Sequence, residues 1–289
     1  MDRAIRTRLE RLLGSSVLTA DSLGGAHGVR HYRLTLAGGR SAFAKIQDQD
    51  LSGNGPDAVS AEAHGLHWLG EAEAAPVPAV LASDSSCLVT EWIVAGPSTQ
   101  AAATRFGREL ANLHAAGAAS FGAPWRGFIA SLPLPNDAAG DWPEWFAANR
   151  VLPYARIASD AGTLSRAETR LIEAAATRSA ELAGPPEPPS RIHGDCWSGN
   201  VLWSGGRGWL IDPAAHGGHR ETDLAMLALF GAPFLDQILA AYAKTAPLAD
   251  GWQARVPLHQ LHPLLVHVCL FGSSYRDAAV GAARAVLAA

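Results

Sequence analysis

Cysteine is rare in this 289-residue chain, which contains only Cys87, Cys196 and Cys269. Because the number is odd, the spacings are wide and no CxxC pair occurs, the pattern argues against a disulfide framework and a cysteine-based zinc site. We therefore expect a reducing, cytoplasmic environment.

Charge is also low, since charged residues make up 17% of the chain and the net charge is −4. Such a chain lacks the basic surface that binds nucleic acid or an anionic membrane.

Long uncharged segments are equally rare, and residues 256–275 form a stretch of 20 residues without Asp, Glu, Lys or Arg. The stretch is long enough to span a membrane, but it carries His259, His262 and His267, and polar groups are costly in lipid. A buried helix is the better prediction, so we expect no membrane partner. The spacing of these histidines is not that of a zinc site. A hydrophobic content of 48% argues against disorder.

The predicted elements divide the chain into two parts. Strand patterns fall in the first third, over residues 29–36, 41–46, 79–82 and 87–94. A polar loop is expected over 47–57 and a helix over 58–73, and glycine turns are expected at Gly24-Gly25 and Gly38-Gly39. After residue 96 the patterns are mainly helical, over 106–114, 145–157, 165–182 and 221–289. We therefore predict an α+β fold of two lobes, residues 1–94 and 95–289, with a cleft between them.

The strongest chemical signal is the segment HGDCWSGN, residues 193–200, which is followed by two short apolar strands and Asp212. A loop that carries Asp195 and Asn200 can direct both side chains to one point, and a hairpin then returns Asp212 to the same place. Phosphoryl transfer needs an acceptor near the attacking hydroxyl and oxygen ligands for Mg²⁺. The spacing therefore predicts a kinase-type catalytic loop. The alternative is structural, with a turn at 193–195 and a helix cap at Asp212.

Lysine is almost absent, since Lys45 and Lys244 are the only two among 23 lysine and arginine residues. Lys45 interrupts the apolar strand 41–46, where the compact ammonium of lysine suits a phosphate ligand. Its expected partner is Glu62 on the following helix, as in the lysine–glutamate pair of protein kinases. The alternative is an edge-strand lysine with a solvated head.

Two further segments are candidates for nucleotide contacts. Gly24 and Gly25 begin a loop whose backbone N–H groups would cover phosphates, although glycines in a hairpin mostly serve the turn. Glu91, Trp92 and Ile93 lie in the last strand-like run of the first part, where the backbone of a hinge would contact adenine. An ordinary buried strand shares all of these sequence features.

Several segments resemble the fructosamine kinase (ketosamine-3-kinase) family, whose relatives include the aminoglycoside and choline kinases. HGDCWSGNVLW is similar to the catalytic loop of that family, and LIDPAAHGGHRETDLAMLALFG is similar to its metal-binding segment and the helix that follows. FGAPWRGFIASLPLPN and DWPEWFAANRVLP resemble an insertion that separates this family from other small-molecule kinases. HPLLVHVCLFGSSY is similar to its C-terminal helix. The resemblance extends over nearly the whole chain.

This resemblance implies a protein-kinase-like fold with ATP and Mg²⁺ bound between the lobes. It implies transfer of the γ-phosphoryl group to the 3-hydroxyl of a ketosamine, the sugar adduct of an amine. At the matching positions, Asp195 would be the base, and Asn200 and Asp212 would be the Mg²⁺ ligands. Lys45 would hold the α- and β-phosphates, with Glu62 steadying it.

The resemblance also assigns hinge contacts to Glu91 and Ile93 and a sugar platform to Trp197, for which core packing is the alternative. The expected partner is a small-molecule or protein-bound ketosamine, and the expected role is protein deglycation or repair. We expect a monomer or a weak homodimer. The other hypotheses are a kinase of the aminoglycoside or choline type that uses another hydroxyl acceptor, and a nucleotide-binding pseudokinase.

Two single residues and one loop depart from the family pattern. Cys196 stands where leucine is expected, His219 stands where aspartate is usual, and the loop Ala26-His27-Gly28 lacks the polar residues often found there. The last two departures concern the geometry of the loops and the choice of substrate. The phosphotransferase prediction does not depend on them.

Overall fold

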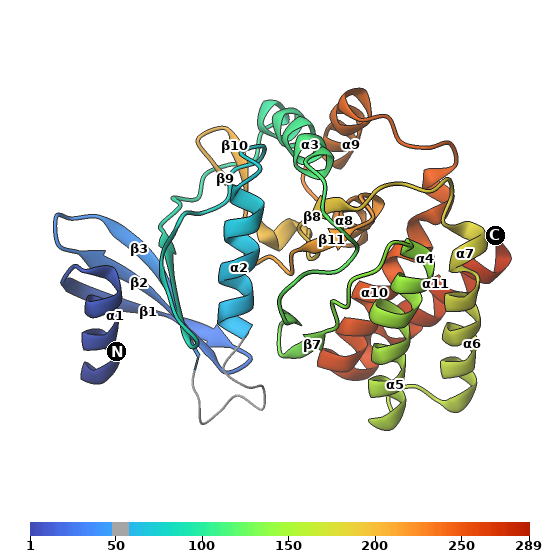
Figure 1. Ribbon diagram of the computed structural model, residues 1–289, viewed down its shortest axis with the longest axis horizontal. Coiled ribbons are helices and arrows are strands. Elements are labelled where there is room, and N and C mark those ends of the chain that lie inside the picture. Colours follow the sequence, from blue (N-terminus) through green and yellow to red (C-terminus); the bar gives the residue numbers. More distant parts are fainter. Residues whose placement is uncertain (48–57) are drawn as a thin grey trace.

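The computed structural model describes residues 1–47 and 58–289. The first part of the described chain is an antiparallel sheet with the strand order β1-β2-β3-β5-β4. Its strands are β1 (Val17–Ala26), β2 (Val29–Leu36), β3 (Ser41–Gln47), β4 (Val80–Ser83) and β5 (Cys87–Glu91). Helix α1 (Arg3–Leu13) precedes the sheet, and α2 (Ala58–Gly70) stands between the sheet and the helical remainder of the chain (Figure 1).

The register of this sheet positions Lys45. Leu34, Ala44 and Val89 are fully buried in one apolar core on the face that α1 covers. Because successive side chains of a strand point to opposite faces, Lys45 points away from that core. It pairs with His31 of β2 on one side and with Leu88 of β5 on the other. Lys45 is therefore in a central strand, and the edge-strand alternative is wrong.

The second part of the described chain is mainly helical. Its helices are α3 (Gln100–Ala115), α4 (Trp142–Phe146), α5 (Leu152–Asp160), α6 (Arg166–Thr177), α7 (Ser179–Leu182), α8 (Glu221–Leu229), α9 (Leu235–Thr245), α10 (Trp252–Phe271) and α11 (Arg276–Ala288). Three short antiparallel pairs join them: β6 (Gly127–Ile129) with β7 (Leu132–Leu134), β8 (Ser190–Ile192) with β11 (His216–Gly218), and β9 (Val201–Ser204) with β10 (Arg207–Leu210). In Figure 1, α5, α6, α10 and α11 lie together on the side away from the large sheet.

The uncharged segment 256–275 is a buried helix over most of its length, as expected. Helix α10 continues through Pro257 and Pro263, and the 3₁₀ turn η3 (Gly272–Tyr275) follows it. His259 and His262 are buried within α10. None of the helices among the described residues combines the length and the hydropathy that a membrane span requires.

The first hairpin differs from the prediction. Gly24 and Gly25 lie inside β1, and the chain turns instead at His27 and Gly28, which have φ values of 51° and 78°. A β-carbon at Gly25 would lie 2.2 Å from the carbonyl oxygen of Val29. Close pairing of β1 with β2, rather than a turn, therefore requires glycine at position 25.

Several predicted boundaries are also wrong. The predicted helix 145–157 is divided by the π-helical turn η1 (Ala147–Val151), and the predicted helix 58–73 ends at Gly70. The predicted strand 87–94 ends at Glu91. Of the predicted loop 47–57, Gln47 is the last residue of β3, and the remainder lies outside the described residues.

Candidate active site

The loop between β8 and β9 holds two of the predicted residues side by side. Asn200 lies in the 3₁₀ turn η2 (Ser198–Asn200), and its Nδ2 donates to Oδ2 of Asp195 at 2.8 Å and to the Asp195 carbonyl at 2.9 Å. The backbone N–H of Ile211 donates to the carbonyl of Asn200 at 3.0 Å. The β9–β10 hairpin therefore returns Asp212 to this loop, as the spacing predicts. Asp212 has φ 54°, a left-handed conformation that is costly for a residue other than glycine and is typical of functional sites.

Lys45 joins the two parts of the molecule. Its Nζ lies 2.8 Å from Oε2 of Glu62 on α2 and 2.8 Å from Oδ1 of Asp212. Burial disfavours the charged forms of Lys45 and Asp212. The two carboxylates nevertheless raise the pKa of Lys45, and the ammonium of Lys45 holds the pKa of Asp212 below its usual value. The side chain of Asp212 is 42% exposed, whereas that of Lys45 is 9% exposed. Asp212 therefore presents its carboxylate to the cavity beside the buried lysine.

Asp195 is suited to accept a proton near neutral pH. Burial raises the pKa of Asp195 to about 7, although the hydrogen bond from Asn200 favours the charged form. A general base works best when its pKa lies close to the working pH. The environment of this carboxyl is therefore consistent with a base that takes a proton from a hydroxyl group.

Asp223, on α8, anchors the backbone of the same loop. The backbone N–H of His193 donates to its Oδ2 at 2.7 Å, and that of Gly194 donates to its Oδ1 at 3.0 Å. Nε2 of His114 lies 3.1 Å from Oδ2. The side chain of Asp223 is fully buried. Asp223 therefore holds the backbone of the loop that carries Asp195.

His193 and Gly194 fix the shape of the loop. The backbone N–H of Asp195 donates to Nδ1 of His193 at 3.2 Å, so Nε2 carries the proton and donates to the Ile211 carbonyl at 2.9 Å. Burial lowers the pKa of His193, which keeps the ring neutral. Gly194 has φ 81°, and a β-carbon there would lie 2.2 Å from the carbonyl oxygen of Ala214. His193 therefore acts through the position of Asp195.

Two adjoining cavities open at these residues. The first has a volume of about 370 Å³, and its lining includes Lys45, Glu62, Asp195, Asn200 and Asp212. The second, of about 280 Å³, is more apolar, and its lining includes Phe43, Leu66, Glu91, Trp92 and Ile93. His31, Glu62 and Asp212 line both cavities. One polar chamber therefore adjoins one apolar chamber, which is the arrangement that a nucleotide with its phosphates requires.

Most of the predicted residues meet at these cavities, with one exception. Gly24 and Gly25 line neither of the two, and Ala26, His27 and Val29 of the same hairpin line the polar cavity instead. The sequence analysis did not identify His31, which lines both cavities. Its place opposite Lys45 in the β2–β3 pair would have indicated that both side chains lie on the same face of the sheet.

The whole chain, residues 1–289, matches the family model described as fructosamine kinase. The chain belongs to the fructosamine kinase family. It is therefore a transferase of the kinase type that phosphorylates a hydroxyl group.

Similar proteins support membership of the fructosamine kinase family. A protein of Klebsiella aerogenes named "Probable ketoamine kinase" is 31% identical over 257 residues, which are 87% of this chain and 86% of the relative. A crystal structure from Thermobifida fusca, provisionally described as a fructosamine-3-kinase, is 50% identical, covers 100% of both chains and has a TM-score of 0.96. A choline kinase from Streptococcus pneumoniae covers 99% of both chains at 17% identity with a TM-score of 0.67, which shows the shared protein-kinase-like fold.

The donor set of the polar cavity fits Mg²⁺. The cation prefers oxygen ligands, usually one or two carboxylates together with phosphate oxygens. Asp212 offers a half-exposed carboxylate, and Asn200 uses its amide nitrogen for Asp195, which leaves its amide oxygen as the remaining polar atom of the side chain. ATP use follows from the kinase family to which the chain belongs.

Trp197 lies at the mouth of the polar cavity. It lines the cavity, and 36% of its surface is exposed, so the core-packing alternative is wrong. A β-carbon at Gly199 would lie 2.3 Å from the Trp197 ring. The glycine of the WSGN segment therefore allows the indole to fold back over its own loop.

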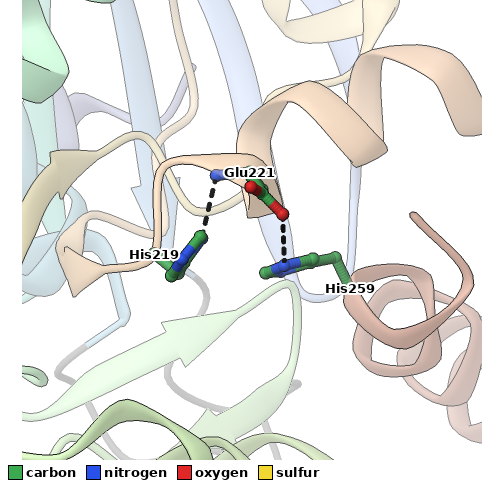
Figure 2. A group of neighbouring side chains, drawn as sticks. All are labelled: His219, Glu221 and His259. Carbon is green, nitrogen blue, oxygen red and sulfur yellow. Dashed lines mark hydrogen bonds and ion pairs between the residues drawn. The ribbon is translucent and has the colours of Figure 1, made fainter. Parts of the chain in front are cut away.

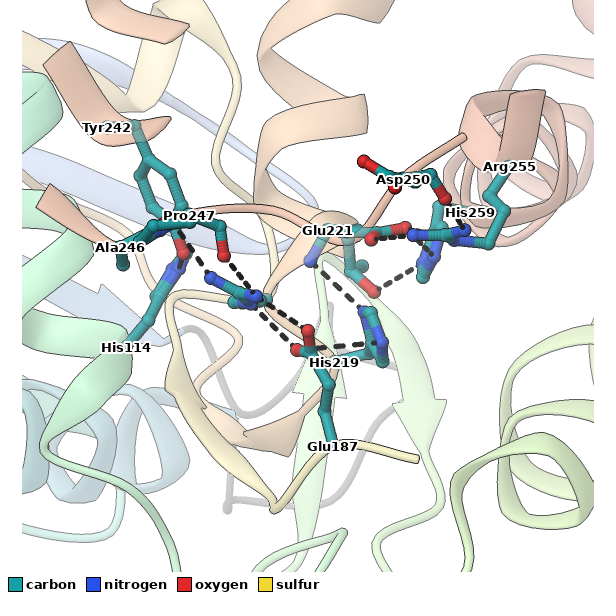
Figure 3. Close-up of polar contacts among 12 residues, drawn as sticks. His114, Glu187, His219, Glu221, Tyr242, Ala246, Pro247, Asp250, Arg255 and His259 are labelled. Atoms are coloured by element: carbon teal, nitrogen blue, oxygen red, sulfur yellow. Dashed lines mark hydrogen bonds and ion pairs between the residues drawn. The ribbon is translucent and has the colours of Figure 1, made fainter. Parts of the chain in front are cut away.

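His219, one of the departures from the family pattern, lies in a second cluster of buried polar groups. Figure 2 shows His219 and His259 on either side of Glu221, and their ligand atoms lie within 4.8 Å of one another. However, Arg255 donates to both carboxylate oxygens of Glu221, at 2.8 and 2.5 Å (Figure 3). A metal ion would have to displace this buried guanidinium, so the cluster is a structural network.

The same network attaches the proline-rich linker to the helices. Arg220 donates to both oxygens of Glu187, at 2.7 and 2.6 Å, and Glu187 belongs to the linker 184–190. Burial lowers the pKa of His219 to about 3, so this ring is neutral. A histidine in place of the usual aspartate therefore adds no charge to a cluster that already contains a buried ion pair.

Proposed function

We propose that this chain transfers the γ-phosphoryl group of ATP to the 3-hydroxyl of a ketosamine and thereby acts in the repair of sugar-modified amines. The observation that carries the proposal is the meeting of Lys45 with Glu62 and Asp212, at 2.8 Å each, in a cavity that Asp195 also lines. These are the cation and carboxylates that phosphoryl transfer requires. Family membership supports the ketosamine as acceptor.

The nucleotide is assigned to the two cavities together. We assign adenine to the apolar cavity, where Glu91, Trp92 and Ile93 offer hinge contacts, and the phosphates to Lys45 in the polar one. Residues 1–94 would supply most of these contacts, and residues 95–289 would supply the catalytic loop and the acceptor site. Asp212 and the amide oxygen of Asn200 would hold Mg²⁺, which supplies charge neutralisation for the transferred group when it is bound.

The acceptor hydroxyl is assigned to Asp195. This carboxylate would orient the 3-hydroxyl of the sugar and take its proton as the oxygen attacks phosphorus, and Asn200 would hold the carboxylate in place. Trp197 would support the sugar ring from the mouth of the cavity, since aromatic faces pack well against the apolar side of a sugar.

A panel of acceptors tests the proposal. Fructosyl-, ribulosyl- and erythrulosyl-amines, an aminoglycoside and choline are incubated in parallel with ATP and Mg²⁺. ATP consumption is measured, and phosphorus NMR locates the new phosphate. We expect phosphorylation at O3 of at least one ketosamine. Turnover of only an aminoglycoside or a choline-like amine would favour another small-molecule kinase. Thermal stabilisation by Mg²⁺-ATP without turnover of any acceptor would indicate a pseudokinase.

A further inference from the structure

A line of aromatic rings leads away from Trp197 over the helical part of the molecule. Phe230 lies 5.7 Å from Trp197 between ring centroids, and His267 lies 5.0 Å from Phe230. His267 in turn lies 4.7 Å from Tyr275 and 5.4 Å from Phe271. We call these five residues the aromatic strip. They come from the loop after β8, the end of α8, and the continuous segment formed by the last turns of α10 and η3, so the fold brings together three separate segments to make one surface.

The strip is uncharged and accessible. Phe271 is 52% exposed and Trp197 is 36% exposed, while Phe230, His267 and Tyr275 are partly buried. Nδ1 of His267 donates to the Pro263 carbonyl at 2.7 Å, and burial lowers the pKa of this histidine, so its ring is neutral. Arg276, the neighbour of Tyr275, directs its Nε toward Glu168 and Asp277, at 3.6 and 3.5 Å. An exposed, contiguous apolar patch beside a catalytic cavity is typical of a ligand-binding surface.

One end of the strip lines the polar cavity, and the other end contacts a residue that lines it. Trp197 lines that cavity two residues after Asp195. At the other end, Phe271 lies edge-on to His27, with 6.4 Å between ring centroids, and His27 also lines the cavity from the β1–β2 hairpin. The strip therefore continues the wall of the acceptor site onto the surface, and the first hairpin meets it from the opposite part of the molecule.

The chemistry of the acceptor identifies what this surface would hold. A ketosamine consists of a sugar and an amine substituent joined through a secondary ammonium. If the sugar hydroxyl is at Asp195 and the sugar ring is at Trp197, the substituent leaves the cavity on the side where the strip begins. Aromatic faces attract ammonium groups and bury apolar groups. Resting on the function proposed above, we propose that the aromatic strip binds the amine-borne part of the acceptor and favours ketosamines whose amine carries an apolar or aromatic substituent.

Two ketosamines of one sugar, made from methylamine and from benzylamine, test this proposal. We expect the wild-type enzyme to have a kcat/KM about tenfold higher for the benzylamine adduct, since an aromatic contact of this kind is worth about tenfold at most. Phe271→Ala should reduce this ratio at least threefold, and Phe271→Trp should preserve it. Phe234→Ala is the matched control, because Phe234 is also exposed, at 41%, but lies outside the strip at the start of α9. It should leave the ratio unchanged.

The outcomes separate this proposal from the function on which it rests. Phosphorylation of both adducts with equal kcat/KM, or an equal loss for both adducts in Phe271→Ala, would overturn the role of the strip and leave the ketosamine kinase intact. Phosphorylation of neither adduct, together with no calorimetric binding of either, would overturn the proposed function and the strip with it. A wild-type preference for the benzylamine adduct that Phe271→Ala removes supports both.

Discussion

Replacement of Asp223 by asparagine is expected to loosen the catalytic loop and to destabilise the fold. The carboxylate of Asp223 is fully buried and accepts from the backbone N–H groups of His193 and Gly194, at 2.7 and 3.0 Å, while His114 lies 3.1 Å away. Asparagine has the same shape, but it turns one acceptor oxygen into a donor that would face another donor. Breaking a buried, charge-assisted contact of this kind costs about 3–5 kcal/mol. We expect a loss of that size in the free energy of unfolding.

Urea unfolding at 25 °C and steady-state kinetics measure this effect. A protein in the upper part of the ordinary stability range, above about 8 kcal/mol, stays folded after such a loss, so the kinetics remain measurable. We expect kcat to fall at least tenfold, because Asp195 loses the anchor of its loop, while the KM for ATP changes less. Asp236→Asn is the control, since Asp236 is exposed in the first turn of α9. A destabilisation below about 1 kcal/mol with an unchanged kcat would refute the reasoning.

The other predictions concern buried histidines and a glycine. Burial lowers the pKa of His219 and His262 to about 3, so the unfolded chain binds more protons below pH 6.5. The free energy of unfolding should fall by about 1.4 kcal/mol per pH unit for each ring between pH 6.5 and 4, and a flat profile in urea titrations would contradict this. Gly194→Ala should lower the melting temperature and turnover, because the β-carbon would lie 2.2 Å from the Ala214 carbonyl oxygen. Gly281→Ala in α11 is the control, because nothing lies within 4 Å of the added β-carbon, and it should stabilise the protein by up to about 1 kcal/mol. Equal changes in melting temperature for the two variants would exclude the clash at Gly194.

The arrangement of the candidate site could be predicted in large part because most of its members are local in sequence. Asp195, Asn200 and Asp212 lie on one loop and one hairpin, so their spacing alone indicates that they meet. Lys45 and Glu62 lie on a strand and the next helix. The contact of Lys45 with Asp212 joins distant parts of the chain, and no local pattern encodes it. The contact was not predicted, since the resemblance implied only that both residues lie at one nucleotide site.

The errors have identifiable physical causes. Gly24 and Gly25 carry the usual turn signal, but close strand pairing at Gly25 explains the glycine equally well. The strands β8 and β11 contain three residues each, which is too short for a periodic pattern. The π-helical turn 147–151 contains neither glycine nor proline, so its sequence gives no sign of a break in the helix.

The central claim is that the carboxylate of Asp195 takes the proton of an acceptor hydroxyl beside an ATP held by Lys45. Asp195→Asn tests it most directly, because the amide keeps the shape of the side chain and removes only its basicity. Binding of Mg²⁺-ATP, measured by calorimetry, should stay within about threefold of wild type, whereas kcat for ketosamine phosphorylation should fall by about 10²–10⁴-fold. A variant that binds nucleotide normally and phosphorylates ketosamines at the wild-type rate would contradict the account.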